Sequence, residues 1–326
     1  MSLDETLMAR AVTVGESARL DAPPNPWVGA LVVVDGSVVS EGATQRPGHN
    51  HAEIEALARA GDAARGATLV VTLEPCDHVG RTGACTRAIL DAGVARVVVG
   101  VLDPDPQVAG RGVARLRSAG VRVDVGVRAD LVGEQLAAYL WHRRTGRPYV
   151  LAKVAATLDG VVSMADGTSQ WITGEAARAD AHELRARSQA IVVGANTVRS
   201  DDPRLTARVG GRVLEPLRVV LGRAPKEARV RPCLEYTGDL SALLDDLGAR
   251  GVLQVLIEGG ATTTSAFVEA GLVNRFAWYV APAWAGGSRT RAALANLTTP
   301  TIGALRRGRV VGVARIGEDV RLDVEV

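Results

Sequence analysis

The fold and chemistry of the first half of the chain are decided by the stretch Thr72-Leu-Glu-Pro-Cys-Asp-His-Val-Gly-Arg-Thr-Gly-Ala-Cys85, together with His51-Ala-Glu53 upstream of it. One imidazole and two thiolates are nitrogen and sulfur ligands that favour a tetrahedral zinc ion. Three protein ligands leave the fourth position to water, which is the arrangement of catalytic zinc sites. We therefore predict a catalytic zinc site with His51, Cys76 and Cys85 as ligands.

Glu53 is the predicted proton carrier of this site. Zinc-dependent deaminases share the pattern H-x-E followed by P-C-x-x-C, in which the glutamate moves protons without binding the metal. This chain departs from the pattern because eight residues, rather than two, separate Cys76 from Cys85. Since residues i and i+2 lie on nearly opposite sides of a regular helix, His51 and Glu53 share a site only in an irregular or first turn. For any one of these residues alone, a buried structural role is the alternative.

Length and breaker residues predict two domains. A chain of 326 residues is about twice the size of a common single domain. The polar segment Arg143-Arg-Thr-Gly-Arg-Pro148 contains glycine and proline and predicts the linker, which gives domains over residues 1–145 and 146–326. Strand and helix signals alternate in each half, so we expect two α/β domains, the second with an antiparallel end.

Apolar periodicity gives the expected elements. In the first domain we expect helices over 2–20, from His51, over Thr86–Ala92 and Arg111–Ala119 and through Leu140, and strands over Val28–Val34, Val38–Ser40, Ala67–Leu73, Val94–Val101 and Val121–Val127. In the second we expect helices over Gly174–Ser188, Leu240–Arg250 and from Ala261, and strands over Tyr149–Ala156, Ala190–Val193, Leu217–Leu221, Val252–Ile257, Arg275–Ala281, Val310–Ile316 and Val320–Val326.

Composition excludes several classes of protein. The net charge is only +2 and no run of like charges occurs, so we expect neither nucleic acid nor membrane as a partner. The first ten residues carry early acids and predict no signal peptide, and no stretch approaches the about 18 apolar residues of a membrane span. Three cysteines are an odd number that argues against a disulfide framework. We expect a cytoplasmic protein.

Three features of the second half are candidates for ligand binding or catalysis. Ile257-Glu-Gly-Gly-Ala-Thr-Thr-Thr-Ser265 follows an apolar strand and opens a predicted helix, whose backbone amides suit a phosphate, although a tight turn is the alternative. Lys153, one of two lysines in the chain, lies mid-strand in apolar surroundings, where we favour positioning or protonating a substrate over a structural ion pair. Arg223 comes just after the expected strand Leu217–Leu221 and is a candidate to hold the 2′-phosphate of a cofactor. A solvated side chain without a binding role is the equal alternative. No G-x-G-x-x-G occurs.

The first half resembles the deaminase half of the bifunctional riboflavin-biosynthesis deaminase-reductases. The resemblance rests on Asn25-Pro-Trp-Val-Gly29, Gly48-His-Asn-His-Ala-Glu53 and the wide cysteine spacing with Gly-Arg-Thr inside it. It implies a cytidine-deaminase-like α/β/α domain that binds zinc through the three predicted ligands. It also implies that the pyrimidine and phosphoribosyl parts of the substrate contact Asn25, His78, Arg81 and Thr82. The chain departs from the family pattern at Thr44, Asp77 and Val79.

The second half resembles the reductase half of the same family. The resemblance rests on blocks at 153–160, 169–173, 184–186, 194–198, 201–208 and 258–260, with Ala156 and Thr157 replacing the usual Met-Ser. It implies a dihydrofolate-reductase-like α/β fold that uses NADPH. The implied cofactor contacts, with Arg223 added, are Ala155, Trp171, Thr197, Asp201, Arg223, Gly260, Ala261, Thr262, Thr263, Thr264, Ser265 and Ala266. The implied substrate contacts are Ser169, Arg185, Leu205, Arg208 and Glu258.

The two resemblances together imply two consecutive reactions on small molecules. The first domain is expected to deaminate 2,5-diamino-6-(phosphoribosylamino)pyrimidinone, and the second to reduce the ribosyl group of the product with NADPH. A nucleic-acid deaminase with an accessory domain is a rival that low net charge and only 11 aromatic residues disfavour. The second rival is a ligand-binding protein whose two domains have lost enzymatic activity. We expect a homo-oligomer, a dimer or tetramer, and assign no role to Cys233 or Lys226.

Overall fold

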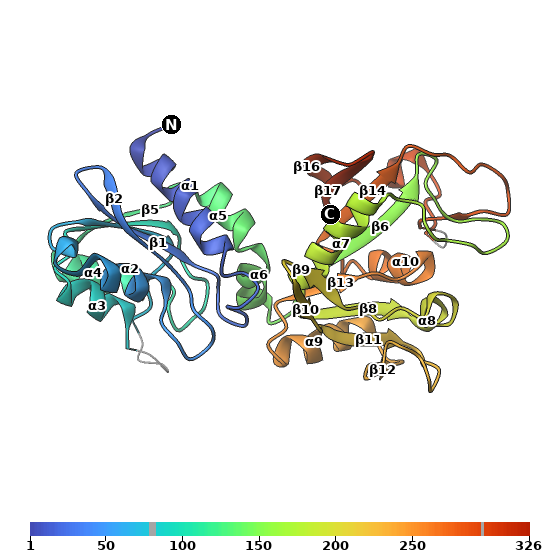
Figure 1. Cartoon of the computed structure of the whole chain (residues 1–326), viewed down its shortest axis with the longest axis horizontal. Helices are drawn as coiled ribbons and strands as arrows, with labels where there is room; N and C mark the ends of the chain where they lie inside the picture. The colour runs from blue at the N-terminus through green and yellow to red at the C-terminus, as the bar shows by residue number, and fades with distance from the viewer. Residues whose placement is uncertain (78–82, 295–296) are drawn as a thin grey trace. The chain divides into compact units, whose positions relative to one another are not determined.

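The computed structural model describes residues 1–77, 83–294 and 297–326, which form two compact units, Met1–Gly146 and Arg147–Val326 (Figure 1). The break falls inside the segment predicted as a linker. That segment begins as helix, however, because α6 extends to Thr145. In the described part of the chain, no helix is both long and apolar enough to cross a bilayer.

The first unit is built on a mixed sheet in the order β2-β1-β3-β4-β5, in which β3, β4 and β5 run parallel and β1 pairs antiparallel with β2 and β3. Its strands are β1 (Gly29–Val34), β2 (Ser37–Ala43), β3 (Thr68–Leu73), β4 (Arg96–Val101) and β5 (Arg122–Val125). Its helices are α1 (Leu3–Glu16), α2 (Ala52–Ala60), η1 (Gly61–Ala64), α3 (Cys85–Asp91), α4 (Arg111–Ser118), α5 (Ala129–Gln135) and α6 (Ala137–Thr145).

Two glycines let helices approach this sheet closely. A Cβ on Gly29 of β1 would lie 1.9 Å from the carbonyl oxygen of Ala11 in α1. A Cβ on Gly42 of β2 would lie 2.2 Å from the carbonyl oxygen of Ala52, which opens α2. Only glycine permits such backbone approach. Figure 1 shows α2, α3 and α4 on one face of the sheet and α1 and α5 on the other, the α/β/α arrangement that was predicted.

The second unit contains a larger sheet in the order β12-β11-β8-β13-β6-β14-β17-β16. It is parallel from β12 to β14 and ends in the antiparallel strands β17 and β16, as predicted. The strands are β6 (Tyr149–Thr157), β8 (Ala190–Gly194), β11 (Leu217–Leu221), β12 (Leu234–Tyr236), β13 (Gln254–Ile257), β14 (Arg275–Ala281), β16 (Arg309–Ile316) and β17 (Asp319–Glu325). Outside this sheet lie β7 (Val161–Ser163), β9 (Ala207–Val209), β10 (Arg212–Leu214) and β15 (Arg291–Ala292).

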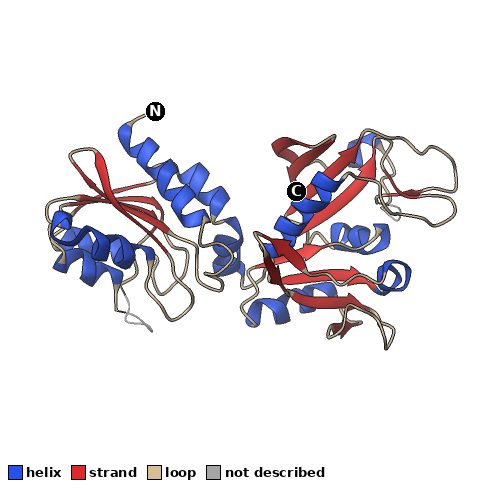
Figure 2. Ribbon diagram, in the orientation of Figure 1, coloured by secondary structure: helices blue, strands red, loops and turns tan. Residues whose placement is uncertain are grey.

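Helices cover both faces of the larger sheet (Figure 2). They are α7 (Glu175–Ala186), α8 (Ala195–Asp201), α9 (Leu240–Ala249), α10 (Ala261–Glu269) and η2 (Ile302–Ala304). Because side chains alternate along a strand, β6 contributes to two cores. Val150 and Val154 pack with α9 and α10, whereas Leu151 packs with α7 and α8. Lys153 has the parity of Leu151 and therefore belongs to the face of α7 and α8.

Several sequence expectations need correction. The helix expected through Leu140 is two helices, α5 and α6, and the helix expected over 2–20 ends at Glu16. The prediction also missed α8 and the short strands β7, β9, β10, β12 and β15. Strands of two or three residues are too short to show a period of two, and the seven residues of α8 are mostly polar.

Candidate active sites in the two units

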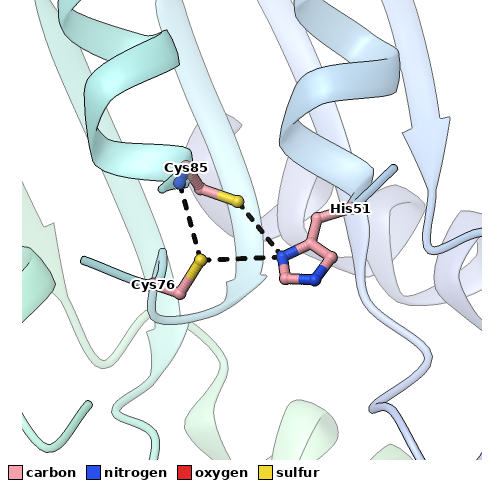
Figure 3. Close-up of side chains that lie close together, drawn as sticks. All are labelled: His51, Cys76 and Cys85. Atoms are coloured by element: carbon pink, nitrogen blue, oxygen red, sulfur yellow. Dashed lines mark hydrogen bonds between the residues drawn. The ribbon is translucent and has the colours of Figure 1, made fainter. Parts of the chain in front are cut away.

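The His–Cys–Cys cluster of the first unit is built at the ends of three elements (Figure 3). His51 is the N-cap residue of α2, and Cys85 is the first residue of α3. Cys76 follows the carboxyl end of β3 by three residues. The strand β3 is central in the sheet, and α2 and α3 begin near its carboxyl end. Three residues that are distant in sequence therefore meet at this end of the sheet.

The geometry of the cluster fits a zinc ion. Nδ1 of His51 lies 3.3 Å from Sγ of Cys85 and 3.6 Å from Sγ of Cys76, and the three ligand atoms lie within 4.8 Å of one another. Tetrahedral zinc with ordinary Zn–S and Zn–N bonds separates such atoms by about 3.5 to 3.8 Å. The backbone N–H of Cys85 also donates to Sγ of Cys76, at 3.5 Å. The three ligand atoms therefore lie close to the spacing that one bound zinc ion sets.

The electrostatics of the cluster favour a thiolate. A hydrogen bond from Cys85 and another from His51 lower the pKa of the Cys76 thiol to about 4. The neighbouring Cys76 sulfur raises the pKa of Cys85, and the hydrogen bond with Cys76 raises the pKa of His51. The amide at the start of α3 supplies further positive potential. A cation bound here replaces these protons as the counter-charge.

Glu53 lies in the first turn of α2, directly after the N-cap His51, which is the arrangement that the i, i+2 spacing requires. Its side chain is buried, with 4% of the residue exposed. Burial and the negative charge of Cys76 raise the pKa of the Glu53 carboxyl to about 7, and its side chain interacts with that of Cys85. A carboxyl group with this pKa beside the ligands is suited to accept and donate a proton near neutral pH.

The remaining predicted deaminase residues are placed in part. Asn25 lies half-buried on the loop before β1. The hydroxyl of Thr44 accepts a hydrogen bond from the backbone N–H of Val28, at 3.1 Å, and therefore has a structural role. The Asp77 carboxylate accepts from the hydroxyl of Thr86, at 2.5 Å, which ties the Cys76 loop to α3. His78, Val79, Arg81 and Thr82 lie outside the described residues.

Glu74 is a site-forming residue that the sequence reasoning missed. Its buried carboxylate accepts backbone hydrogen bonds from Gly110 at 2.9 Å, Val113 at 3.2 Å and Asp103 at 3.3 Å. A Cβ on Gly112 would lie 1.9 Å from the carbonyl oxygen of Pro75. The start of α4 is thus pinned against the strand end that carries Cys76. A glutamate between an apolar strand and the Pro-Cys pair was the available signal.

The second unit contains a cavity of about 1280 Å³ at the carboxyl ends of β8, β11 and β13. The chain leaves β8 toward β11 and leaves β13 toward β14, so the sheet order reverses between β8 and β13, the place where open α/β sheets bind ligands. All predicted reductase residues except Ser265 line this cavity. Ser265 is instead buried, with 1% exposed, and its hydroxyl has no hydrogen-bond partner among the residues that the structure describes.

Two helices begin at this cavity. Gly194 is the N-cap of α8 and Gly260 is the N-cap of α10, and neither provides a side-chain cap. The backbone N–H of Gly260 donates to the hydroxyl of Thr197, at 3.3 Å, whereas other amides of the first turns have no partner within the helix. Free amides at helix starts suit phosphate groups, so this wall fits a phosphorylated cofactor.

A charged pair also lines this cavity. Nε and Nη2 of Arg185 donate to the two carboxylate oxygens of Glu258, at 2.6 and 2.7 Å. The forked face of Arg185, predicted to bind phosphate, is therefore directed at Glu258. Burial is the strongest single influence and acts to raise the pKa of Glu258, but the charge and hydrogen bonds of Arg185 together with the charges of Lys153 and His182 lower this pKa overall.

Lys153 lies beside this pair. Among the described residues it forms no ion pair within 4.0 Å, so the structural ion pair that was the alternative is not formed. Burial lowers the pKa of the Lys153 ammonium, the charge of Glu258 opposes this, and that of Arg185 adds to it. An amine that gives up its proton readily and faces the cavity is suited to act as a proton donor.

The cavity is strongly cationic. Trp171 is 69% exposed, and the guanidinium of Arg178 lies 4.8 Å from the centroid of its indole ring. The sequence reasoning singled out only four of the lining cations, Lys153, Arg185, Arg208 and Arg223. The others are Arg178, Arg199, Arg204, Arg229, Arg289 and Arg291, against the acids Asp201, Asp202 and Glu258. Such a lining fits ligands that carry several phosphates.

Comparison with known proteins identifies the family of each unit. A family model described as the RibD C-terminal domain matches residues 148–322, and one for the cytidine and deoxycytidylate deaminase zinc-binding region matches residues 1–101. The riboflavin biosynthesis protein RibD of Mycobacterium tuberculosis H37Rv is 42% identical over 335 residues, which cover 99% of this chain and 97% of that protein. The chain belongs to the RibD family.

Other RibD proteins and solved structures are similar over most of the chain. The Escherichia coli K12 protein is 40% identical over 321 residues, covering 86% of this chain and 88% of its own length. RibD of Acinetobacter baumannii has a TM-score of 0.92 at 37% identity, and covers 99% of this chain and 98% of its own. A Thermotoga maritima structure described as a diaminohydroxyphosphoribosylaminopyrimidine deaminase/5-amino-6-(5-phosphoribosylamino)uracil reductase has a TM-score of 0.89 at 31% identity, with 99% and 98% covered. The predicted α/β fold of both halves is confirmed.

Proposed function

We propose that this chain carries out two consecutive steps of riboflavin biosynthesis. The first unit removes an amino group hydrolytically from 2,5-diamino-6-(phosphoribosylamino)pyrimidinone. The second reduces the ribosyl group of 5-amino-6-(phosphoribosylamino)uracil to ribityl with NADPH. The observation that carries this proposal is the presence, in one chain, of a His–Cys–Cys cluster with a buried glutamate and of a separate cationic cavity at a sheet switch point.

In the first reaction His51, Cys76 and Cys85 hold the metal, and Glu53 handles the protons. Zinc, when bound by these side chains, supplies an activated water for hydrolysis. The Glu53 carboxylate takes a proton from the attacking water and delivers it to the leaving amino group. Its raised pKa of about 7 allows both protonation states near neutral pH. We assign substrate contacts to Asn25 and, by resemblance, to His78, Arg81 and Thr82.

In the second reaction the helix starts at Gly194 and Gly260 hold phosphate groups of the cofactor. NADPH, when bound, supplies the hydride. The Lys153 ammonium, which lines the cavity, positions or protonates the substrate group that accepts the hydride, and Glu258 pairs with Arg185 in the same lining. Arg208 faces the cavity without a carboxylate partner among the described residues and is assigned to the phosphate of the substrate.

The low net charge supports small-molecule substrates over nucleic acid. The homo-oligomer and the cytoplasmic location stay predictions. Product analysis by mass spectrometry tests the proposal. With the diaminopyrimidine substrate and no NADPH, we expect exchange of one amino group for oxygen and nothing further. Adding NADPH is expected to add two hydrogens to the sugar part. An unchanged substrate, or reduction of the diamino compound before deamination, would contradict the proposal.

A further inference from the structure

His182 is a half-buried histidine of the second unit to which no role has been assigned. It lies on α7, three residues before Arg185, so both side chains project from one face of that helix. The helix α7 packs against β9, which contains Arg208. The Nε2 atom of His182 lies 2.8 Å from Nη2 of Arg208, and Nδ1 lies 3.3 Å from the backbone nitrogen of Arg208. The ring therefore contacts both the backbone and the guanidinium of one cavity residue.

The contact with Arg208 identifies the form of the ring. A guanidinium only donates hydrogen bonds, and a neutral imidazole accepts at one nitrogen and donates at the other. Arg208 presents two donors to the ring, its backbone N–H toward Nδ1 and its guanidinium toward Nε2, and a neutral ring accepts only one of them. We take the shorter contact, at Nε2, as the hydrogen bond; the contact at Nδ1 is then not one, and the Nδ1–H has the carbonyl of Thr206 as its acceptor. Thr206 also accepts from Nη1 of Arg185, at 3.2 Å. His182, Arg185 and Arg208 thus converge on one short segment.

The charges around His182 favour the neutral ring. Burial lowers the pKa of His182, the guanidinium groups of Arg185 on α7 and Arg208 on β9 lower it further, and Glu258 after β13 opposes them. Protonation would remove the acceptor for Arg208 and place three cations together. Because a neutral acceptor holds Arg208, its positive charge is not neutralised, whereas the charge of Arg185 is paired with Glu258.

We propose that His182 is a positioning residue of the reductase, which holds the guanidinium of Arg208 in the cavity so that its charge binds the phosphate monoester of the substrate. This inference rests on the proposed function. NADPH also carries phosphates, but we assign these to the amides at Gly194 and Gly260 and to Arg223. His182 therefore affects binding of the substrate and leaves binding of NADPH unchanged.

The test compares His182→Ala and His182→Gln in the full chain, with Glu183→Ala on the exposed side of α7 as control. In His182→Ala, KM for the deaminated phosphoribosyl substrate is expected to rise about fivefold to tenfold, the effect of one lost hydrogen bond to a charged group, with kcat and KM for NADPH unchanged. In His182→Gln the amide oxygen replaces the acceptor and restores KM. The Kd for ribose 5-phosphate, measured by calorimetry, is expected to follow the same order.

The pH dependence supplies a readout that a structural role would not give. As the pH falls through the lowered pKa of His182, KM of the wild-type chain is expected to rise, and this step is absent from His182→Gln. Titration of the substrate phosphate affects both proteins alike. An unchanged KM in His182→Ala, a rise in KM for NADPH, or identical pH profiles would overturn the inference alone. No NADPH oxidation by the wild-type chain would overturn the proposed function and this inference with it.

Discussion

In the first unit three ligand atoms lie within 4.8 Å of one another, whereas in the second the predicted ligand contacts are spread around a cavity of about 1280 Å³. The small site is made by three residues at element ends and a buried carboxyl group. The large one is made by backbone amides, arginines and strand ends from many segments. The difference follows from the ligands, because a metal ion demands a few atoms at fixed distances. A dinucleotide and a sugar phosphate demand a long, positively charged surface.

Substitution effects should therefore differ in size between the units. Loss of one side chain at the His–Cys–Cys cluster or of Glu53 removes metal binding or proton transfer, and therefore the deamination step. Loss of one group in the cavity leaves many others, so binding should weaken without disappearing, except where the group moves a proton.

The largest effect is expected for Glu53→Gln. Ammonia release should fall about 10³-fold, because the amide cannot carry the proton. Bound zinc, measured by metal analysis, should stay at one ion per chain, and NADPH oxidation with the deaminated substrate should stay unchanged. Glu55→Gln, in the same turn of α2, is the matched control. Ammonia release by Glu53→Gln at the wild-type rate would assign the proton step to another group.

The next effect is expected for Lys153→Ala. Reduction of the deaminated substrate should fall about 10²-fold, because a proton donor is lost, while ammonia release is spared. The other lysine of the chain, Lys226, is exposed, and Lys226→Ala serves as control. Stopped-flow measurement of NADPH oxidation separates the reduction step from product release. Equal rates for the Lys153 variant and the control would make Lys153 a packing residue.

A smaller effect is expected for Gly259→Ala. The added Cβ would lie 2.4 Å from Cβ of Thr263, so the start of α10 must shift. Overpacking of this kind costs about 1 to 3 kcal/mol, and we expect KM for NADPH to rise about tenfold. Gly133→Ala in α5, where a Cβ meets nothing within 4 Å, is the control for the added methyl group. A KM for NADPH that does not change would remove the α10 start from the cofactor site.

The smallest effect is expected for Arg223→Ala. Arg223 is exposed on the rim and lines the cavity after β11. If it holds the 2′-phosphate, KM for NADPH should rise about fivefold and KM for NADH should stay the same, as for loss of one charge-assisted hydrogen bond. Steady-state kinetics with the two cofactors measure this, with Lys226→Ala from the same loop as control. Equal changes for both cofactors would contradict the assignment.

The small site could be predicted well from the sequence, because one histidine and two cysteines at a deaminase-like spacing, with a glutamate two residues after the histidine, point strongly to zinc. The expected helices from His51 and over Thr86–Ala92 already put His51 and Cys85 at or next to helix starts, as the structure does. Glu74 and the contact of Gly112 with Pro75 were not, since they depend on backbone groups brought together by the fold. Such contacts have no periodic signature.

The cavity was predicted mainly through resemblance. The net charge of the chain is only +2, so composition did not indicate a cationic cavity. The residue pattern alone indicated a glycine-rich turn after Ile257 and a lysine, Lys153, in an apolar strand. No sequence pattern links His182 with Arg208, because the missed strand β9 brings them together. Resemblance in turn assigned one residue too many to the cofactor. Ser265 lies inside the predicted cofactor-binding segment, but the helical period of α10 turns its side chain into the core.

The order of the two reactions is the central claim, and one recording tests it. Ammonia release and NADPH absorbance are followed together after adding the diaminopyrimidine substrate to the wild-type chain or to Glu53→Gln. We expect ammonia first and NADPH consumption after a lag, in equal final amounts, in the wild type. In Glu53→Gln neither signal should appear until deaminated substrate is added, when NADPH consumption alone begins. Consumption of NADPH by Glu53→Gln before that addition would contradict the account.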